Sequence, residues 1–127
     1  MASQTVKFEY DETHNILFVE DDYVINSEDE VDAFLKLYAD KFKEIGRKAY
    51  IIACIGGLRI NSKVHEYYGL QVKKLLDGSI LGFARYGKDP LARMTVRTSS
   101  RKVNFDINIY DSKDGAIGGI EKMKTNI

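Results

Sequence analysis

Apolar and polar residues alternate near the start of the chain. Val6, Phe8 and Tyr10 recur at every second position, which is the period of a half-buried β-strand. The polar run 11–15 is typical of a turn, and residues 16–19 resume an extended apolar run. We therefore expect an antiparallel hairpin at the beginning of the fold.

The spacing changes to that of an amphipathic helix after Ser27. Ser27 and Glu30 form a capping box, in which a hydroxyl and a carboxylate satisfy backbone amides that are free at a helix start. Gly46 can adopt the left-handed conformation that ends a helix. Between these signals, six apolar residues recur at helical spacing: Val31, Phe34, Leu35, Tyr38, Phe42 and Ile45.

The stretch 48–63, KAYIIACIGGLRINSK, combines a strand, a loop and a helix start. Residues 50–55 are apolar on both faces, which predicts a strand covered on both sides. The run breaks at Gly56 and Gly57, and a second helix is expected over 62–76. Ligands and partners of open α/β sheets bind where strands end and helices begin, so this junction is the leading candidate for a site.

The second half of the chain predicts two further strands with a helix between them. Residues 80–84 predict a strand, and Asp89 followed by Pro90 is typical of a helix start. Over 91–100 the alternation of side chains favours a strand, whereas the four-residue spacing of arginines favours a helix; we expect the helix. Residues 105–109 alternate strictly and predict the last strand.

Ser112 can cap a short final helix, which completes the order β-β-α-β-α-β-α-β-α. Strands joined by helix-length crossovers run parallel. The fold class is therefore α/β, a mostly parallel five-stranded sheet with an N-terminal antiparallel hairpin and about four helices. The length favours one domain over 1–127.

Charge and composition narrow the range of partners. The chain has no net charge, yet residues 1–46 carry twelve acidic and four basic side chains, while residues 47–127 carry seven acidic and fifteen basic ones. A nucleic-acid-binding domain would show an overall basic excess, so we expect no nucleic acid as partner. No apolar run approaches the roughly 20 residues that span a bilayer, so membrane insertion is not expected.

Two features favour the cytoplasm. The single cysteine, Cys54, excludes an intramolecular disulfide, as is usual for a reducing compartment. The start, from Met1 to Gln4, lacks the basic and apolar regions of a secretion signal.

Four segments, taken in order, resemble the STAS domains: ILFVEDDYVINSEDEVDAFL, GLRINSKV, ARYGKDPLAR and NIYDSKDGAIGGI. The chain is most similar to their SpoIIAA-like subgroup, which contains anti-sigma-factor antagonists. This resemblance implies a SpoIIAA/STAS-like fold and a non-enzymatic regulatory domain without a cofactor. It also implies a protein partner, such as a kinase, an anti-sigma-like protein or a sensor.

In the antagonists, the signature loop reads approximately Asp-Ser-Ser-Gly-Leu, and its second serine is phosphorylated by a partner kinase. Ser62 falls at the position of that acceptor, with Asn61 before it. This sequence departs from the pattern at Ile60, which replaces the aspartate, and at Lys63 and Val64, which replace glycine and leucine. The resemblance therefore implies a candidate phosphorylation site at Ser62; the alternative is that Ser62 is a plain helix N-cap.

Arginines supply the other candidate chemistry. Arg85 and Tyr86 are expected near the end of their strand, and Arg93, Arg97 and Arg101 would form one stripe of a helix. An acidic protein or an anionic small molecule could dock there; a solvated face is the alternative. The candidate binding or regulatory residues are Gly56, Gly57, Arg59, Asn61, Ser62, Arg85, Tyr86, Arg93 and Arg97.

We expect no catalytic and no metal-binding residues. His14 and His65 lack the ligand spacing of a zinc site. Asp21 and Asp22 are interpreted as solvated loop residues, and no nucleophile with a base is evident.

The leading hypothesis is docking of a protein partner. The alternative is a small-ligand binder that holds a lipid or anionic molecule between sheet and helix. A homodimer through the sheet edge of the hairpin is also compatible with the sequence.

Overall fold

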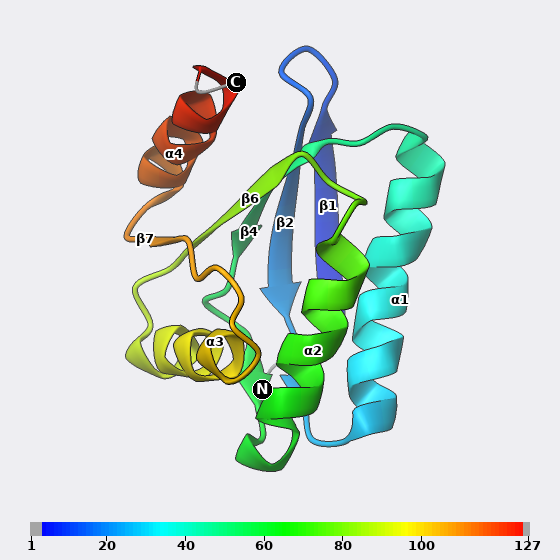
Figure 1. The fold of residues 1–127 in the computed structure, drawn as a ribbon, viewed down its shortest axis with the longest axis vertical. Helices are drawn as coiled ribbons and strands as arrows, with labels where there is room; N and C mark the ends of the chain where they lie inside the picture. Colours follow the sequence, from blue (N-terminus) through cyan, green and yellow to red (C-terminus); the bar gives the residue numbers. More distant parts are fainter. Residues whose placement is uncertain (1–3, 126–127) are drawn as a thin grey trace.

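The computed structural model describes residues 4–125; Met1 to Ser3, part of the segment used to argue against a secretion signal, lie outside them. Five strands form one sheet in the order β1-β2-β4-β6-β7, and two short strands, β3 and β5, form a second (Figure 1). The strands are β1 (Thr5–Asp11), β2 (Ile16–Asp22), β3 (Val24–Ile25), β4 (Tyr50–Cys54), β5 (Arg59–Ile60), β6 (Gly82–Tyr86) and β7 (Ile109–Tyr110). The helices are α1 (Glu28–Ile45), α2 (His65–Leu76), α3 (Pro90–Lys102) and α4 (Lys113–Thr125).

The sheet confirms the predicted topology. β1 and β2 pair antiparallel, whereas β2, β4, β6 and β7 run parallel. The central strand β4 is buried on both faces, with Ile52 between Phe18 of β2 and Ala84 of β6. Because the parallel strands point the same way, their carboxyl ends meet at one edge of the sheet.

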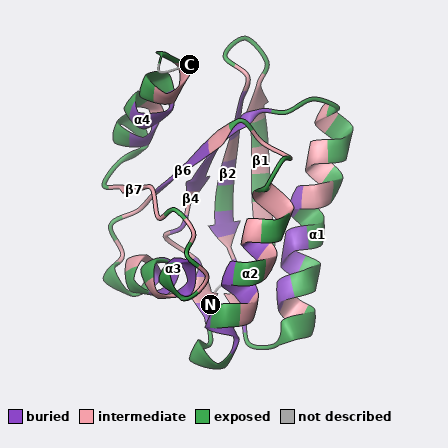
Figure 2. Ribbon diagram, in the orientation of Figure 1, coloured by how far each residue is buried: buried purple, intermediate pink, exposed green. Residues whose placement is uncertain are grey.

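The two faces of the sheet are covered by different helices. The larger core contains inward residues of α1, α2 and α3, and Leu17, Val19 and Ile51 of the sheet belong to it. On the opposite face, α4 inserts Ala116 and Ile120 against the strands. Figure 2 shows buried residues concentrated along the sheet and the inner sides of the helices.

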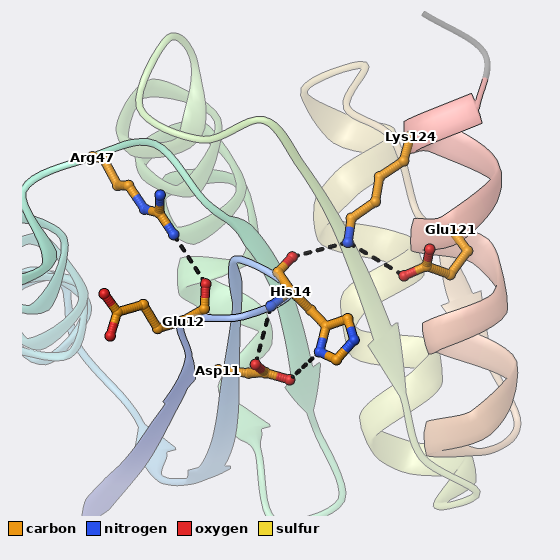
Figure 3. Close-up of polar contacts among 6 residues, drawn as sticks. All are labelled: Asp11, Glu12, His14, Arg47, Glu121 and Lys124. Atoms are coloured by element: carbon orange, nitrogen blue, oxygen red, sulfur yellow. Dashed lines mark hydrogen bonds and ion pairs between the residues drawn. The ribbon is translucent and has the colours of Figure 1, made fainter.

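Polar contacts hold the turn between β1 and β2 (Figure 3). Asp11 accepts hydrogen bonds from the backbone amide of His14 at 3.1 Å and contacts its ring Nδ1 at 2.8 Å. Lys124 Nζ of α4 donates to the carbonyl of His14 at 2.9 Å, and Arg47 Nη2 donates to that of Glu12 at 3.1 Å. The hairpin is thereby tied to the C-terminal helix and to the end of α1.

The predicted helix signals are confirmed. Ser27 accepts a hydrogen bond from the amide of Glu30, and Gly46 ends α1 in the left-handed region with φ of 77°. Asp89 caps α3 and Pro90 occupies its first turn, so the segment 91–100 is a helix as expected. Ser112 accepts a hydrogen bond from the amide of Gly115 at the start of α4.

Several strands differ from the prediction. The last strand is Ile109–Tyr110 instead of 105–109, because Asn104 and Asn108 have φ of 55° and 45° and interrupt the extended backbone. The strand expected at 80–84 is Gly82–Tyr86. The pairing of β3 with β5, two residues each, was not predicted, because strands of that length carry no periodic signal.

No helix within residues 4–125 is both long enough and apolar enough to cross a membrane.

Close packing of α2 on α3 yields a test of the fold. A Cβ added at Gly69 of α2 would collide with the backbone carbonyl of Ser99 in α3, whereas one added at Gly118 of α4 would meet nothing. Gly69→Ala should therefore lower the free energy of unfolding by about 1–3 kcal/mol, the usual cost of overpacking. Gly118→Ala should raise it by up to about 1 kcal/mol, because alanine is the better helix former. Urea unfolding of both variants checks this; a neutral or stabilising Gly69→Ala would contradict the packing.

Candidate functional site

The junction between β4 and α2 begins with a close approach of two backbones. A Cβ at Gly57 would lie 2.8 Å from Oδ1 of Asp22 and 3.1 Å from its Cα. The carbonyl of Gly57 also accepts a hydrogen bond from the amide of Tyr23 at 3.3 Å. Gly57 is thus required for the chain to pass beside the end of β2, whereas a Cβ at Gly56 would make one ordinary contact, with Cys54.

The short sheet of β3 and β5 then fixes the course of the junction. Arg59 and Asn61 donate backbone hydrogen bonds to Tyr23 and Ile25 at 2.9 and 2.8 Å. The guanidinium of Arg59 donates to the carbonyls of Gly56 and Leu58 and forms an ion pair with the carboxylate of Asp89 at 3.1 Å.

This ion pair links the junction to α3. The same carboxylate of Asp89 caps α3 by accepting a hydrogen bond from the amide of Ala92 at 2.9 Å. The structure therefore places Arg59 as a tether inside the junction, with 38% of its side chain exposed.

The helix start differs in detail from the prediction. Residues Ser62–Val64 form a 3-10 turn before α2 begins at His65. Its N-cap is Asn61, whose side-chain oxygen accepts a hydrogen bond from the amide of Lys63 at 3.0 Å, so the plain reading of Ser62 as the N-cap is wrong. Asn61, Ser62 and Lys63 are all exposed, whereas His65 is buried and its Nε2 lies 3.0 Å from the carbonyl of Ile60.

This assignment of the cap can be tested by two substitutions. Asn61→Ala removes the capping oxygen and should lower the free energy of unfolding by about 1 kcal/mol. Ser62→Ala should change it by less than about 0.5 kcal/mol, as expected for an exposed side chain without such a role. Urea unfolding of both variants measures the difference, and an equal loss in Ser62→Ala would contradict the assignment.

The remaining candidate residues lie in three places. Arg93 of α3 donates to the carbonyl of Gly87 at 2.7 Å and to that of Tyr110 at 3.2 Å, so it joins α3 to the carboxyl ends of β6 and β7. Arg97 is exposed on the same helix. Both therefore belong to the end of the molecule that carries the junction.

The side chain of Tyr86 lies beside Cys54 on the face of the sheet that α4 covers. Burial, and next the neighbouring thiol of Cys54, raise the pKa of Tyr86 to about 12. Cys54 itself is half-buried. Both residues end their strands at the point where the junction begins, since the amide of Ile55 donates to the carbonyl of Tyr86 at 3.0 Å.

Arg85 lies in the core. Its guanidinium is 5.0 Å from the ring centre of Phe83, and Nη1 donates to Ser100 Oγ and to the carbonyl of Ile107, both at 3.2 Å. Burial lowers the pKa of Arg85, while Tyr68 and then Tyr38 and Asp21 act in the other direction. The structure thus separates Arg85 from the exposed arginines of α3.

Asp21 is a buried residue that the sequence analysis misplaced. It lies in β2, not in a solvated loop, and accepts a hydrogen bond from the hydroxyl of Tyr38 at 2.6 Å. A cavity of about 40 Å³ between the sheet and the helices α1 and α2 is lined by Asp21, Tyr38, Tyr68 and Arg85 together with apolar side chains. The signal that Asp21 points inward was its register: it follows Leu17 and Val19 at every second position and therefore shares their face of the strand.

Burial gives Asp21 a pH-dependent effect on stability. Desolvation raises its pKa from 3.8 to about 7, although the Tyr38 hydroxyl and the charge of Arg85 oppose the change. Between these two values the folded protein holds a proton that the unfolded chain releases. This group therefore makes the free energy of unfolding fall as the pH rises from about 4 to about 7.

Asp21→Asn should remove that contribution and flatten the pH dependence over this interval. The measurement is the urea midpoint at several pH values, with Glu9→Gln, a change at an exposed carboxylate, as control. A slope that Asp21→Asn leaves unchanged would contradict the effect of burial.

No group of three or more potential metal ligands occurs within residues 4–125.

Comparison with known proteins identifies the fold. No protein-family model matches the chain, and no curated protein sequence is similar to it. Among solved structures, the anti-sigma factor antagonist SpoIIAA in its unphosphorylated form has a TM-score of 0.58. The superposition covers 93% of this chain and 97% of that one, with 11% sequence identity. The chain therefore has a SpoIIAA-like α/β fold, as its sequence motifs indicated.

Proposed function

We propose that this chain is a non-enzymatic regulatory domain that acts by reversible docking of a protein partner. The proposal is supported by the likeness in fold to an anti-sigma factor antagonist whose structure is described as an unphosphorylated form. The docking face would consist of the junction 56–62, the exposed side of α2 and the start of α3. A kinase, an anti-sigma-like protein or a sensor is the class of partner we propose, in the cytoplasm.

The observation that carries the proposal is an exposed serine on a firmly held loop. Ser62 and its neighbours are exposed, yet the preceding residues are fixed by β3, by Asn61 and by the ion pair between Arg59 and Asp89. A rigid, accessible loop binds with little loss of conformational entropy. It also presents Ser62 to a partner at a fixed place on the surface.

We further propose that charge at Ser62 gates docking. A phosphate there would add about two negative charges at the start of a helix, where the helix dipole favours an anion. The folded domain would therefore tolerate the modification. A partner seated on the junction would instead meet a large charged group, which would change its affinity.

The small-ligand alternative receives less support. The cavity between the sheet and the helices α1 and α2 has a volume of about 40 Å³. Ligand pockets usually have volumes of about 300–1,000 Å³. The cavity can hold a few water molecules at most, and a lipid would not fit without rearrangement of the core. Self-association through β1, an edge strand of the sheet, stays a separate proposal.

The gate is tested by capturing partners from a lysate of the source cells on immobilised wild type, Ser62→Ala and Ser62→Asp. We expect Ser62→Ala to capture the same protein as wild type and Ser62→Asp to reduce its recovery at least about tenfold, as like-charge or steric mismatch in an interface does. Thr13→Asp adds the same charge at an exposed turn and should capture like wild type. If Ser62→Asp captures like wild type, the gate is wrong; if no variant captures a protein, docking is wrong as well.

A further inference from the structure

Helix α3 presents a row of cations on the surface. Arg93, Arg97 and Arg101 follow one another at four-residue intervals, which corresponds to about 6 Å along a helix at each step. Lys88, in the loop before the helix, lies at the same hollow. The hollow has a volume of about 500 Å³ and is lined by Lys88, Pro90, Arg93, Met94, Arg97, Thr98 and Arg101.

Most of these charges have no partner among residues 4–125. Arg93 is engaged with two carbonyls and with the carboxylate of Asp111 at 3.4 Å. Within residues 4–125, the side chains of Lys88, Arg97 and Arg101 form no hydrogen bond and no ion pair, and no carboxylate lines the hollow. Their donors are therefore available to an external anion.

Apolar side chains adjoin the cations. Met94 lines the hollow with 56% of its surface exposed, and Leu91, one turn earlier on the same side of the helix, is 49% exposed. Such exposure of two large apolar residues on one helix is unfavourable in water. Methionine and arginine are also enriched in the cores of protein interfaces.

We propose that α3 binds an acidic, amphipathic helical segment of a protein partner. Carboxylates four residues apart on such a segment would match the spacing of Arg97 and Arg101, and each guanidinium can hold a carboxylate with two hydrogen bonds. An apolar side chain of the segment would cover Met94. The inference rests on the proposed docking function and adds a chemical class to the partner.

Charge and shape favour a protein segment over a nucleic acid. The whole chain has no net charge, and twelve acidic side chains of residues 1–46 would repel an extended polyanion. The exposed apolar side chains of Met94 and Leu91 would not form favourable contacts with phosphate groups. A short acidic helix satisfies both the cations and the apolar pair.

The test is a titration of the full chain with a labelled synthetic helical peptide, followed by fluorescence anisotropy at low ionic strength. The peptide carries glutamates at positions i, i+4 and i+8 and leucines on the adjoining stripe, and a second peptide carries glutamines instead of the glutamates. Short duplex DNA and phosphatidylserine vesicles are measured in parallel. The glutamate peptide should bind, and the glutamine peptide should not.

Variants locate the binding. Arg97→Glu with Arg101→Glu should weaken peptide binding at least about tenfold, because like charges then face each other. Arg97→Gln with Arg101→Gln, which keeps the helix propensity, should give a smaller loss. Lys43→Glu with Lys48→Glu changes the net charge equally at exposed positions near the end of α1, and should leave binding within about twofold, because distant charges are screened.

The proposal is overturned if the glutamate peptide does not bind, or if DNA or vesicles bind more tightly than the peptide. It is also overturned if the charge reversals at Arg97 and Arg101 weaken peptide binding no more than the control reversals at Lys43 and Lys48. The titration uses no natural partner, so it is independent of the gate at Ser62. If the peptide does not bind but capture of a partner still depends on Ser62, only this inference is wrong. If the peptide binds but capture of a partner does not depend on Ser62, only the proposed gate is wrong.

Discussion

The parallel pairing of β4 between β2 and β6 is the constraint on which the rest of the structure depends. Because β4 is buried on both faces, helices must cover the sheet on both sides, and the chain can leave the core only past the end of the strand. The carboxyl ends of β4 and β6 therefore lie next to each other, and the segments that follow them, the junction and the start of α3, are brought to one end of the molecule.

Local contacts make that end rigid. The β3–β5 pairing holds the junction to the chain that follows β2, and Asp89 serves both as the cap of α3 and as the ion-pair partner of Arg59. Arg93 adds hydrogen bonds from α3 to the ends of β6 and β7. The exposed groups proposed for docking, Ser62 and the outer arginines of α3, are thus carried by elements that are cross-linked to one another through polar contacts.

Sequence reasoning succeeded where a signal repeats or where a residue has one strong local role. The spacing of apolar residues in α1, the cap at Ser27 and the Asp89-Pro90 helix start each depend on near neighbours. It failed where the outcome depends on tertiary contacts. The burial of Arg85 among Phe83, Ser100 and Ile107 requires three segments to meet. The position of Arg85 in the sequence therefore could not show that it is buried while the outer arginines of α3 are exposed. Asn61, instead of Ser62, became the cap because β5 sets the backbone just before it.

Hydrogen–deuterium exchange of the chain with and without a captured protein partner tests the central claim most directly. The claim is that the end of the molecule formed by the junction and α3 is the docking face. It predicts that protection on binding is concentrated in peptides that cover 56–64 and 88–101. Protection confined to the hairpin of β1 and β2, or to α4, would contradict the claim.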